Sequence, residues 1–495
     1  MKDNRREFLK RSGCALSMVA LATQARHFGL MSAMASPPGG ALSDYRAMVC
    51  ILLSGGNDGN NLIVPNHNNA GVSSYSVYAA SRAAQGLAIA QNQLLSVNVP
   101  RMGNLAYGLH PSLGPVPQYG GINNGIHELW GQGKLAVVAN VGNLITPLTK
   151  AQFNQQPALR PYQLFSHSDQ IQQQQTARAD SPSPLGWAGR IADRTNAANN
   201  PTGRVPMITS ISGTQLFTLG QSTTPLTIPD ANTPLNETLV LSANCCTDPF
   251  SAARTTALAE LRTIDLDSEL VRATSHIMDQ AQAASTALST FQEVTAPFPD
   301  TYLGQQLKQA ARVIKKRTEL NINRQVFFVE HGGFDTHQNQ LSVGAGQTGL
   351  LAELGQAMRA FYDEMGVLGL QNKVTTFTLS DFGRTMEPSG NGSDVGTDHA
   401  WGNHMFVLGG SVLGGDIYGS LRPDGTGNVF PNLQIGGPDD IDSEWSPRGR
   451  WLPTSSVDQY AATLGRWFGL NDADLAAVFP NLANFPTSNL GFMAP

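Results

Sequence analysis

The sequence predicts an α/β fold: a large, mostly parallel β-sheet with helices on both of its faces. Continuous apolar runs of four to eight residues recur along the chain and are typical of strands buried on both faces. Longer amphipathic segments alternate with these runs, which is the βαβ arrangement. With 41% hydrophobic and 14% charged residues, the chain has ample material for a large core. No linker or charge block divides it, so we expect residues 36–495 to form a single domain.

The individual elements follow from these patterns. Strands are expected over 47–53, 135–141, 326–329, 374–379 and 405–408, and helical patterns cover 252–287, 302–316 and 349–368. Near the end of the chain, SSVDQYAATLGRWFGL predicts a capped helix whose apolar face includes Tyr460, Leu464 and Trp467. Residues 213–248 are rich in Thr, Pro, Ser and Asn, so we expect an irregular insertion there, extended or β-rich, as in a lid or an inserted subdomain.

The first 35 residues resemble a twin-arginine signal peptide. Arg5 and Arg6 precede Phe8 and Leu9, a modest apolar stretch follows, and residues 33–35 give an A-x-A cleavage pattern. The apolar stretch is too short to span a bilayer, and Cys14 lacks the apolar residue that a lipid-attachment site has before it. We therefore expect the twin-arginine export machinery as a partner, a periplasmic or secreted location, and no stable membrane anchor.

Charge and cysteine content argue against two classes of protein, those that bind nucleic acid and those held together by disulfide bonds. Residues 1–35 hold six Lys or Arg and two Asp or Glu, so the chain without them has a net charge of about −9. Such a balance argues against nucleic acid as a partner. Three cysteines remain, Cys50 in an apolar run and the adjacent pair Cys245 and Cys246. They are too few for a disulfide framework in a chain of this length.

Chemistry is expected between positions 330 and 404, where four of the ten histidines lie. Three pieces, VEHGGFDTH, TLSDFGRT and GTDHAWGNH, place His and Asp beside predicted strands. In an open α/β sheet, loops at one edge converge on a cleft, and neutral imidazole and carboxylate groups there can hold a divalent cation. Any one of these pieces alone is more often a hydrogen-bonded turn. Their clustering favours a functional site.

Several segments, in order, resemble one known family. They are VCILLSGGNDGNNLIVP, HPSL, KLAVVANVG, SHSDQIQ, VEHGGFDTH, TLSDFGRT, GTDHAWGNHMFVLGG and SVDQYAATLGRWFG. Together they resemble the exported bacterial domain of unknown function fifteen-hundred-and-one, which is placed with the alkaline phosphatase and sulfatase superfamily. The resemblance spans nearly the whole chain after residue 35. It implies an alkaline-phosphatase-like sheet with metal ligands at its carboxyl edge.

The resemblance also implies metal ligands. Asp335 and His337 look like a ligand pair, Asp381 stands in the place of a D-H-G loop, and His399 looks like the late histidine. Phe382 replaces the histidine of D-H-G, which puts a two-metal centre in doubt. The first strand lacks the usual Asp at its end, and Asp58 either swings back as a ligand or belongs to a tight turn. The expected cofactor is zinc, manganese, calcium or magnesium.

Three residues are candidates for catalysis. Ser166 is either a nucleophile at a helix start, with His167 and Asp169 beside it, or a helix cap. Arg384 either neutralises charge on the transferred group or braces Asp381 or Glu387. His404, or alternatively His331, would protonate the leaving oxygen.

These assignments describe an exported metal-dependent hydrolase of phosphate or sulfate esters, with an anionic ester as substrate. The alternative is a non-catalytic exported binding or assembly protein on a degenerate hydrolase fold.

Overall fold

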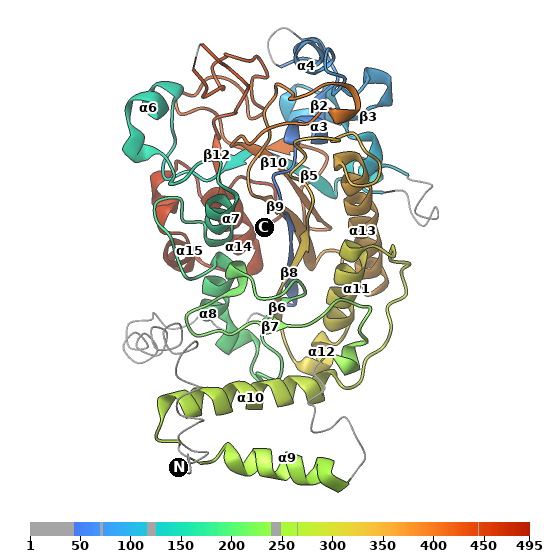
Figure 1. Cartoon of the computed structure of the whole chain (residues 1–495), viewed down its shortest axis with the longest axis vertical. Helices are drawn as coiled ribbons and strands as arrows, with labels where there is room; N and C mark the ends of the chain where they lie inside the picture. The colour runs from blue at the N-terminus through green and yellow to red at the C-terminus, as the bar shows by residue number, and fades with distance from the viewer. Residues whose placement is uncertain (1–43, 70–72, 116–124, 239–248, 265, 444) are drawn as a thin grey trace, which may run out of the picture.

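A nine-stranded sheet crosses the centre of the molecule in the order β11-β5-β10-β9-β1-β8-β6-β7, with β12 paired to β5 (Figure 1). The computed structural model describes residues 44–495 apart from 70–72, 116–124, 239–248, 265 and 444. The strands of this sheet are β1 (Arg46–Leu53), β5 (Leu135–Gly142), β6 (Ile208–Ser210), β7 (Leu226–Thr227), β8 (Arg324–His331), β9 (Val374–Ser380), β10 (Asn403–Gly409), β11 (Ile417–Tyr418) and β12 (Ser455–Ser456).

One strand of the sheet runs against the others, and this direction positions the site. β10 pairs antiparallel with both β5 and β9, whereas the pairs of β1 with β8 and β9 are parallel. The residues that precede β10 therefore lie at the same sheet edge as the residues that follow β1, β8 and β9. The predicted mostly parallel α/β sheet is confirmed, and so are the five predicted strands, which match β1, β5, β8, β9 and β10.

Helices cover both faces of the sheet, as predicted (Figure 1). On one face lie α11 (Tyr302–Lys315) and α13 (Gln347–Val367), which pack against each other. The other face is covered by α7 (His167–Thr176), α8 (Trp187–Asn199), α14 (Val457–Phe468) and α15 (Asp472–Val478). Shorter helices are α3 (Gly59–Leu62), α4 (Tyr75–Arg82), α5 (His127–Gly131), α6 (Lys150–Gln155) and α12 (Arg317–Leu320).

The helix predicted near the end of the chain is confirmed as α14. Ser456 caps it in a capping box with Gln459. Tyr460, Leu464 and Trp467 are all buried, in agreement with the predicted apolar face. The helix is thereby fixed against the sheet.

The predicted helical region 252–287 is divided into two helices, α9 (Pro249–Leu261) and α10 (Glu269–Leu288). Ser268, in extended conformation, is the N-cap residue of α10. Ser and Asp favour helix caps and turns over helix interiors. Asp267 and Ser268, directly before α10, therefore explain why the helical pattern is interrupted there.

The predicted insertion at 213–248 is described up to residue 238. Its strand β7 pairs parallel with β6 and extends the edge of the sheet. The Asp193 carboxylate accepts hydrogen bonds from the backbone N–H groups of Gln221, Ser222 and Thr223, which ties the segment to α8. The described part is therefore an extended excursion attached to the main sheet.

A small antiparallel sheet accompanies the large one. It has the order β2-β4-β3, with β2 (Ile63–Pro65), β3 (Leu95–Val99) and β4 (Leu105–Leu109). Cys50 is buried within β1, as its apolar surroundings predict. In the part of the chain that the structure describes, no helix is both long and apolar enough to cross a membrane. The predicted signal peptide at 1–35 with Cys14, and the pair Cys245 and Cys246, lie outside the described residues.

Candidate functional site

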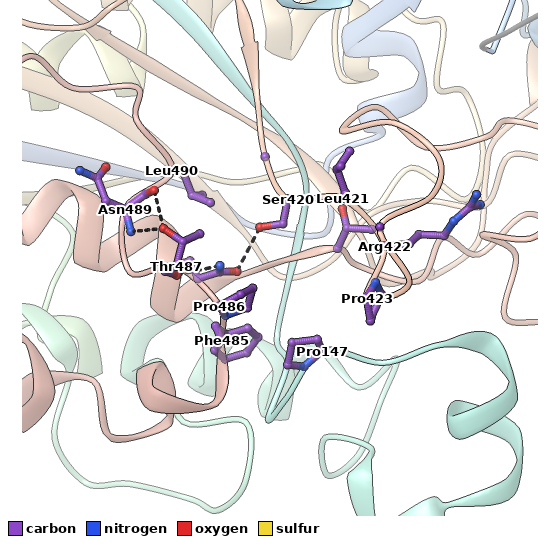
Figure 2. Close-up of a pocket in the computed structure, with 14 residues that line it drawn as sticks. Pro147, Ser420, Leu421, Arg422, Pro423, Phe485, Pro486, Thr487, Asn489 and Leu490 are labelled. Carbon is purple, nitrogen blue, oxygen red and sulfur yellow. Dashed lines mark hydrogen bonds between the residues drawn. The ribbon is translucent and has the colours of Figure 1, made fainter.

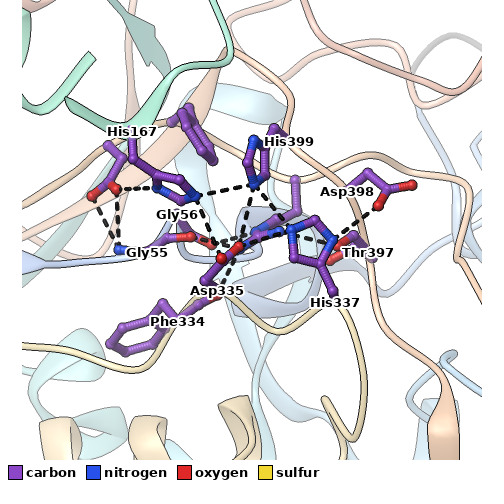
Figure 3. A network of polar contacts seen from close by, with 12 residues as sticks. Gly55, Gly56, His167, Phe334, Asp335, His337, Thr397, Asp398 and His399 are labelled. Carbon is purple, nitrogen blue, oxygen red and sulfur yellow. Dashed lines mark hydrogen bonds and ion pairs between the residues drawn. The ribbon is translucent and has the colours of Figure 1, made fainter. Parts of the chain in front are cut away.

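Four side chains meet at the sheet edge that the strand directions define (Figure 3). His167 is the first residue of α7, Asp335 and His337 follow β8, and His399 precedes β10. We call these four residues the His/Asp cluster. The structure thus brings together three of the five predicted ligands, Asp335, His337 and His399.

The nitrogen and oxygen atoms of the cluster face one another at close range. His399 Nε2 lies 3.1 Å from His167 Nε2 and 3.0 Å from His337 Nε2. Asp335 Oδ1 lies 3.0 Å from His337 Nε2 and 3.3 Å from His399 Nε2, and Asp335 Oδ2 lies 3.5 Å from His167 Nε2. The Nε2 atoms of all three imidazoles therefore lie within 3.5 Å of an Asp335 carboxylate oxygen.

The other ring nitrogen of each histidine faces a hydrogen-bond acceptor. His167 Nδ1 lies 2.7 Å from Asp381 Oδ2, and His337 Nδ1 lies 3.0 Å from Asp398 Oδ1. His399 Nδ1 donates to the Phe165 carbonyl oxygen at 2.9 Å. Since a carboxylate or carbonyl oxygen accepts only, the proton of each neutral ring belongs on Nδ1. Each Nε2 then presents a lone pair to the centre of the cluster.

Three converging lone pairs and a carboxylate repel one another unless a cation lies among them. Zinc–nitrogen distances of about 2.0–2.1 Å place neighbouring ligand atoms roughly 3.0–3.4 Å apart. The contacts in the cluster, 3.0 to 3.5 Å long, are of this size. The ligand atoms of His167, Asp335 and His399 all lie within 4.8 Å of one another, whereas His337 is outside this group and contacts two of its members, Asp335 and His399. His167, Asp335 and His399 therefore fit a single metal ion, with His337 beside them.

Asp381, predicted as a ligand, lies behind His167 instead of within the cluster. Its carboxylate is fully buried and accepts a hydrogen bond from the Gly55 N–H as well as from His167 Nδ1. This contact raises the pKa of His167. Gly55 has φ +114°, and a Cβ there would lie 2.4 Å from the backbone nitrogen of Asp335. Only glycine fits where the β1 loop crosses the site.

Asp398 holds His337 in the same manner. Its carboxylate also accepts from Ser389 Oγ at 2.6 Å and pairs with Arg448 Nη1 at 2.8 Å. Burial by itself raises the pKa of Asp398, but the hydrogen bonds from Ser389 and His337 and the charge of Arg448 outweigh it and lower the pKa to about 2. The carboxylate is therefore ionised at neutral pH and accepts the His337 N–H.

Arg384 is fully buried and braces Asp335, whereas the sequence predicts that it neutralises charge on the transferred group or, alternatively, braces Asp381 or Glu387. Its nitrogens donate to the carbonyl oxygens of Gly55, Gly56, Phe334 and Thr397. Burial opposes ionisation of Asp335, but Arg384 outweighs it and lowers the pKa of this carboxyl. With every nitrogen engaged and no exposed surface, the guanidinium ties three loops together and does not face a substrate.

Asp58 does not join the cluster either. Both of its carboxylate oxygens pair with Arg82, at 2.5 and 3.1 Å, and both side chains are fully buried. One oxygen also accepts from the Asn60 N–H as the N-cap of α3. The expected ligand role is replaced by a buried ion pair, because Arg82 on α4 reaches the position from a segment distant in sequence.

The two histidines considered as proton donors are packed away from the cluster. His404 Nδ1 accepts from the Asn140 N–H at 3.1 Å, and its ring stacks on Phe430 with centroids 4.8 Å apart. His331 Nε2 donates to the Leu350 carbonyl oxygen at 3.0 Å. Burial lowers the pKa of both histidines to about 4, so both are neutral at pH 7.

Ser166 occupies the N-cap position of α7, but its side chain makes no capping hydrogen bond. Its Oγ donates to Asp169 Oδ2 at 2.6 Å. The following residue, His167, is the one that enters the cluster. The sequence predicts a functional role for the segment SHSDQ, but through the Ser166 hydroxyl, whereas in the structure the His167 imidazole is the group that enters the cluster.

An aromatic ring forms one wall of the cluster. Phe382 is fully buried, and its ring centroid lies 4.7 Å from that of His167 and 4.6 Å from that of His399. The side chain that replaces the histidine of the superfamily pattern therefore packs behind two ligands and offers no donor of its own.

A cavity lies away from the cluster (Figure 2). Its volume is about 470 Å³ and its lining residues come from 419–425 and 485–490, together with Pro147, Thr454 and Gln459. None of the four cluster residues lines it. The chemistry of the side chains, and not the volume of a cavity, therefore locates the candidate site.

Comparison with known proteins places the chain in a family. Residues 45–433 match the family model described as "Protein of unknown function (DUF1501)". The chain belongs to this family. A comparison with curated proteins found no match.

Two solved structures are similar to this DUF1501 protein over much of its length. One is the PsFucS1 sulfatase from Pseudoalteromonas sp., with 8% identity over 96% of this chain and 74% of that chain and a TM-score of 0.28. The other is Ps i-CgsB in complex with k-i-k-neocarrahexaose, with 6% identity over 87% and 74% and a TM-score of 0.29. At scores this low, neither likeness bears on the function of this chain.

Proposed function

We propose that the His/Asp cluster holds one divalent transition-metal ion and that the protein is a metal-dependent hydrolase of phosphate or sulfate esters. One observation carries the proposal: three imidazoles, each with Nδ1 on an acceptor, present Nε2 within 3.5 Å of the Asp335 carboxylate. We further propose that it acts outside the cytoplasm after twin-arginine export, on the strength of the Arg5-Arg6 pattern.

The donor set favours zinc or manganese over calcium or magnesium. Imidazole suits zinc and its neighbours, whereas calcium and magnesium take mainly oxygen ligands. The side chains of His337 and Asp335 are 43% and 45% exposed, so water and a substrate reach the cluster from outside. An open side of this kind is a feature of catalytic rather than structural metal sites.

When bound, a divalent ion would polarise an ester oxygen and lower the pKa of a water molecule. Neighbouring residues of the chain orient the proposed ligands for metal binding. Asp381, Asp398 and the Phe165 carbonyl fix the three ring orientations, and Arg384 fixes the Asp335 carboxylate. Such outer contacts remove the need for reorganisation during the reaction. Ser166 and His404 have no part in this mechanism.

Metal content and turnover test the proposal together. Protein purified without chelators should carry about one zinc or manganese ion per chain and hydrolyse activated aryl phosphates or aryl sulfates. Asp335→Ala should lose both properties. Asp363→Ala is a matched control. The Asp363 side chain is also paired with an arginine and is 40% exposed, against 45% for Asp335. Metal-free wild-type protein, or metal retained in Asp335→Ala, would refute the metal site.

The alternative function is that of a non-catalytic binding or assembly protein. It is favoured by Ser166, whose hydroxyl is bonded to Asp169 and is not directed at the cluster as a side-chain nucleophile would be. A protein with one stoichiometric ion and no turnover across phosphate and sulfate esters would support this alternative.

A further inference from the structure

Arg450 lies directly against the His/Asp cluster. Its Nε donates to the backbone carbonyl oxygen of His399 at 2.9 Å. Its guanidinium carbon lies 5.1 Å from the centroid of the Phe165 ring, and the carbonyl of the same Phe165 accepts from His399 Nδ1. These two contacts of the guanidinium therefore belong to the site that holds His399.

Part of this guanidinium is unused. Nη1 bonds to Asp442 Oδ1 at 2.8 Å, and no described residue accepts a hydrogen bond from Nη2. The side chain is 25% exposed. Its hydrogen-bonding capacity therefore remains available to a ligand that approaches from solvent.

The other two arginines near the site have no such capacity. Arg384 is fully buried, and each of its nitrogens has a protein acceptor. Arg448 uses all three nitrogens, on Glu387, Ser389 and Asp398. Among the three, Arg450 is the one suited to contact a substrate, a role that sequence reasoning gave to Arg384.

The loop that carries Arg450 is held in place before any ligand binds. The fully buried Asp440 accepts hydrogen bonds from the backbone N–H groups of Gly436, Asp442, Gly449 and Arg450. Asp442 also accepts from the Arg448 N–H at 2.9 Å. A guanidinium anchored on two sides loses little conformational freedom on binding, which favours affinity.

We propose that Arg450 forms a subsite for a tetrahedral oxyanion beside the His/Asp cluster and selects anionic esters as substrates. The inference rests on the proposed function. A planar guanidinium pairs with phosphate or sulfate oxygens through charge-assisted hydrogen bonds, and arginine is suited to this task. The subsite supplies the local positive charge that a protein with an acidic overall balance needs in order to attract an anion.

Calorimetric titration with inorganic phosphate and, separately, inorganic sulfate tests the subsite. Arg450→Gln should weaken binding of the preferred anion about tenfold, which is the usual scale for a charge-assisted hydrogen bond. Arg450→Lys should recover part of the loss, because the charge is kept without the planar fork. Arg422→Gln is the matched control, since Arg422 is 22% exposed, is paired with Asp439 and lies in the loop at the separate cavity.

Metal analysis of the same variants separates this proposal from the proposed function. Unchanged metal content in Arg450→Gln together with weaker anion binding supports the subsite. Equal anion binding by wild type and Arg450→Gln, or no binding of either anion by wild type, overturns it. A metal-free wild type would refute the metal centre, while titration of that protein would still decide whether Arg450 binds the anion.

Discussion

Two sets of histidines in this molecule use opposite ring nitrogens. We call His167, His337 and His399 the ligand histidines, for their proposed role. In these histidines Nδ1 faces an acceptor and Nε2 faces the cluster. In the packing histidines the arrangement is reversed. His110 and His404 accept a backbone N–H at Nδ1, and the Nε2 of His331 donates to a carbonyl oxygen. The proton of a packing histidine therefore belongs on Nε2.

The two sets also differ in burial. Burial lowers the pKa of each packing histidine to about 4. The side chains of the ligand histidines are 25% to 43% exposed at the sheet edge. Under the proposed function, the partner of the second ring nitrogen, more than the presence of histidine, distinguishes the proposed metal ligands from core residues.

The largest expected effect is on metal binding. His399→Ala removes the ring that lies closest to both other imidazoles, so metal content should fall from about one ion per chain to less than about 0.1. Elemental analysis measures it. His276→Ala, on α10 and exposed, is the matched control and should keep its metal. Equal metal loss in both variants would contradict the distinction between ligand and other histidines.

The packing set should make the stability of the protein depend on pH. Their folded pKa of about 4 lies below the usual 6.5, so the stability that each contributes is present above pH 6.5 and is lost as the pH falls from 6.5 towards 4. Between pH 7 and pH 5, each packing histidine should lower the free energy of unfolding by about 2 kcal/mol.

Urea unfolding of metal-free protein at both pH values measures this loss. His404→Asn keeps an acceptor for the Asn140 N–H but does not titrate, so its stability should fall by about 2 kcal/mol less than that of wild type. An unchanged pH dependence in this variant would show that His404 is not held neutral.

A smaller effect is expected from the carboxylate behind His337. Asp398→Asn keeps the shape of the side chain but weakens its hold on the His337 N–H, so metal affinity should fall about 10- to 100-fold. Competition with a chromogenic chelator measures the affinity. Asp363→Asn is the control: Asp363 pairs with Arg359 on α13, so this variant should keep the metal affinity of wild type. Full affinity in Asp398→Asn would show that the ring orientation is set by other contacts.

The smallest effect is expected at Ser166. Its hydroxyl bonds to Asp169 and neither caps α7 nor contacts a cluster residue, so Ser166→Ala should change turnover less than about twofold. Steady-state kinetics with an activated aryl ester measures it. A loss of several orders of magnitude would restore Ser166 as the nucleophile.

The sequence was sufficient for the strands because each is a continuous buried apolar run, as in β1 and β9. It did not reveal that β10 is antiparallel, because strand direction depends on pairing with distant segments. That direction explains why His399, before a strand, meets Asp335, after one.

For a similar reason the sequence pointed to Asp335, His337 and His399 of the His/Asp cluster but not to His167. His167 and Ser166 are neighbours in sequence, and only the packing of α7 against the sheet decides which side chain enters the cluster. The sequence offers Asp58 as a possible ligand, but in the structure its carboxylate is paired with Arg82, 24 residues later in the chain. The motifs identified the loops, but the partners of each side chain come from the fold.

The most direct test is anomalous X-ray diffraction from crystals of protein prepared without chelators. Data collected on both sides of the zinc and manganese absorption edges should show one strong peak about 2 Å from the Nε2 atoms of His167, His337 and His399. Well-ordered imidazoles with no anomalous peak among them, or a peak bound only by residues outside the His/Asp cluster, would contradict the metal site.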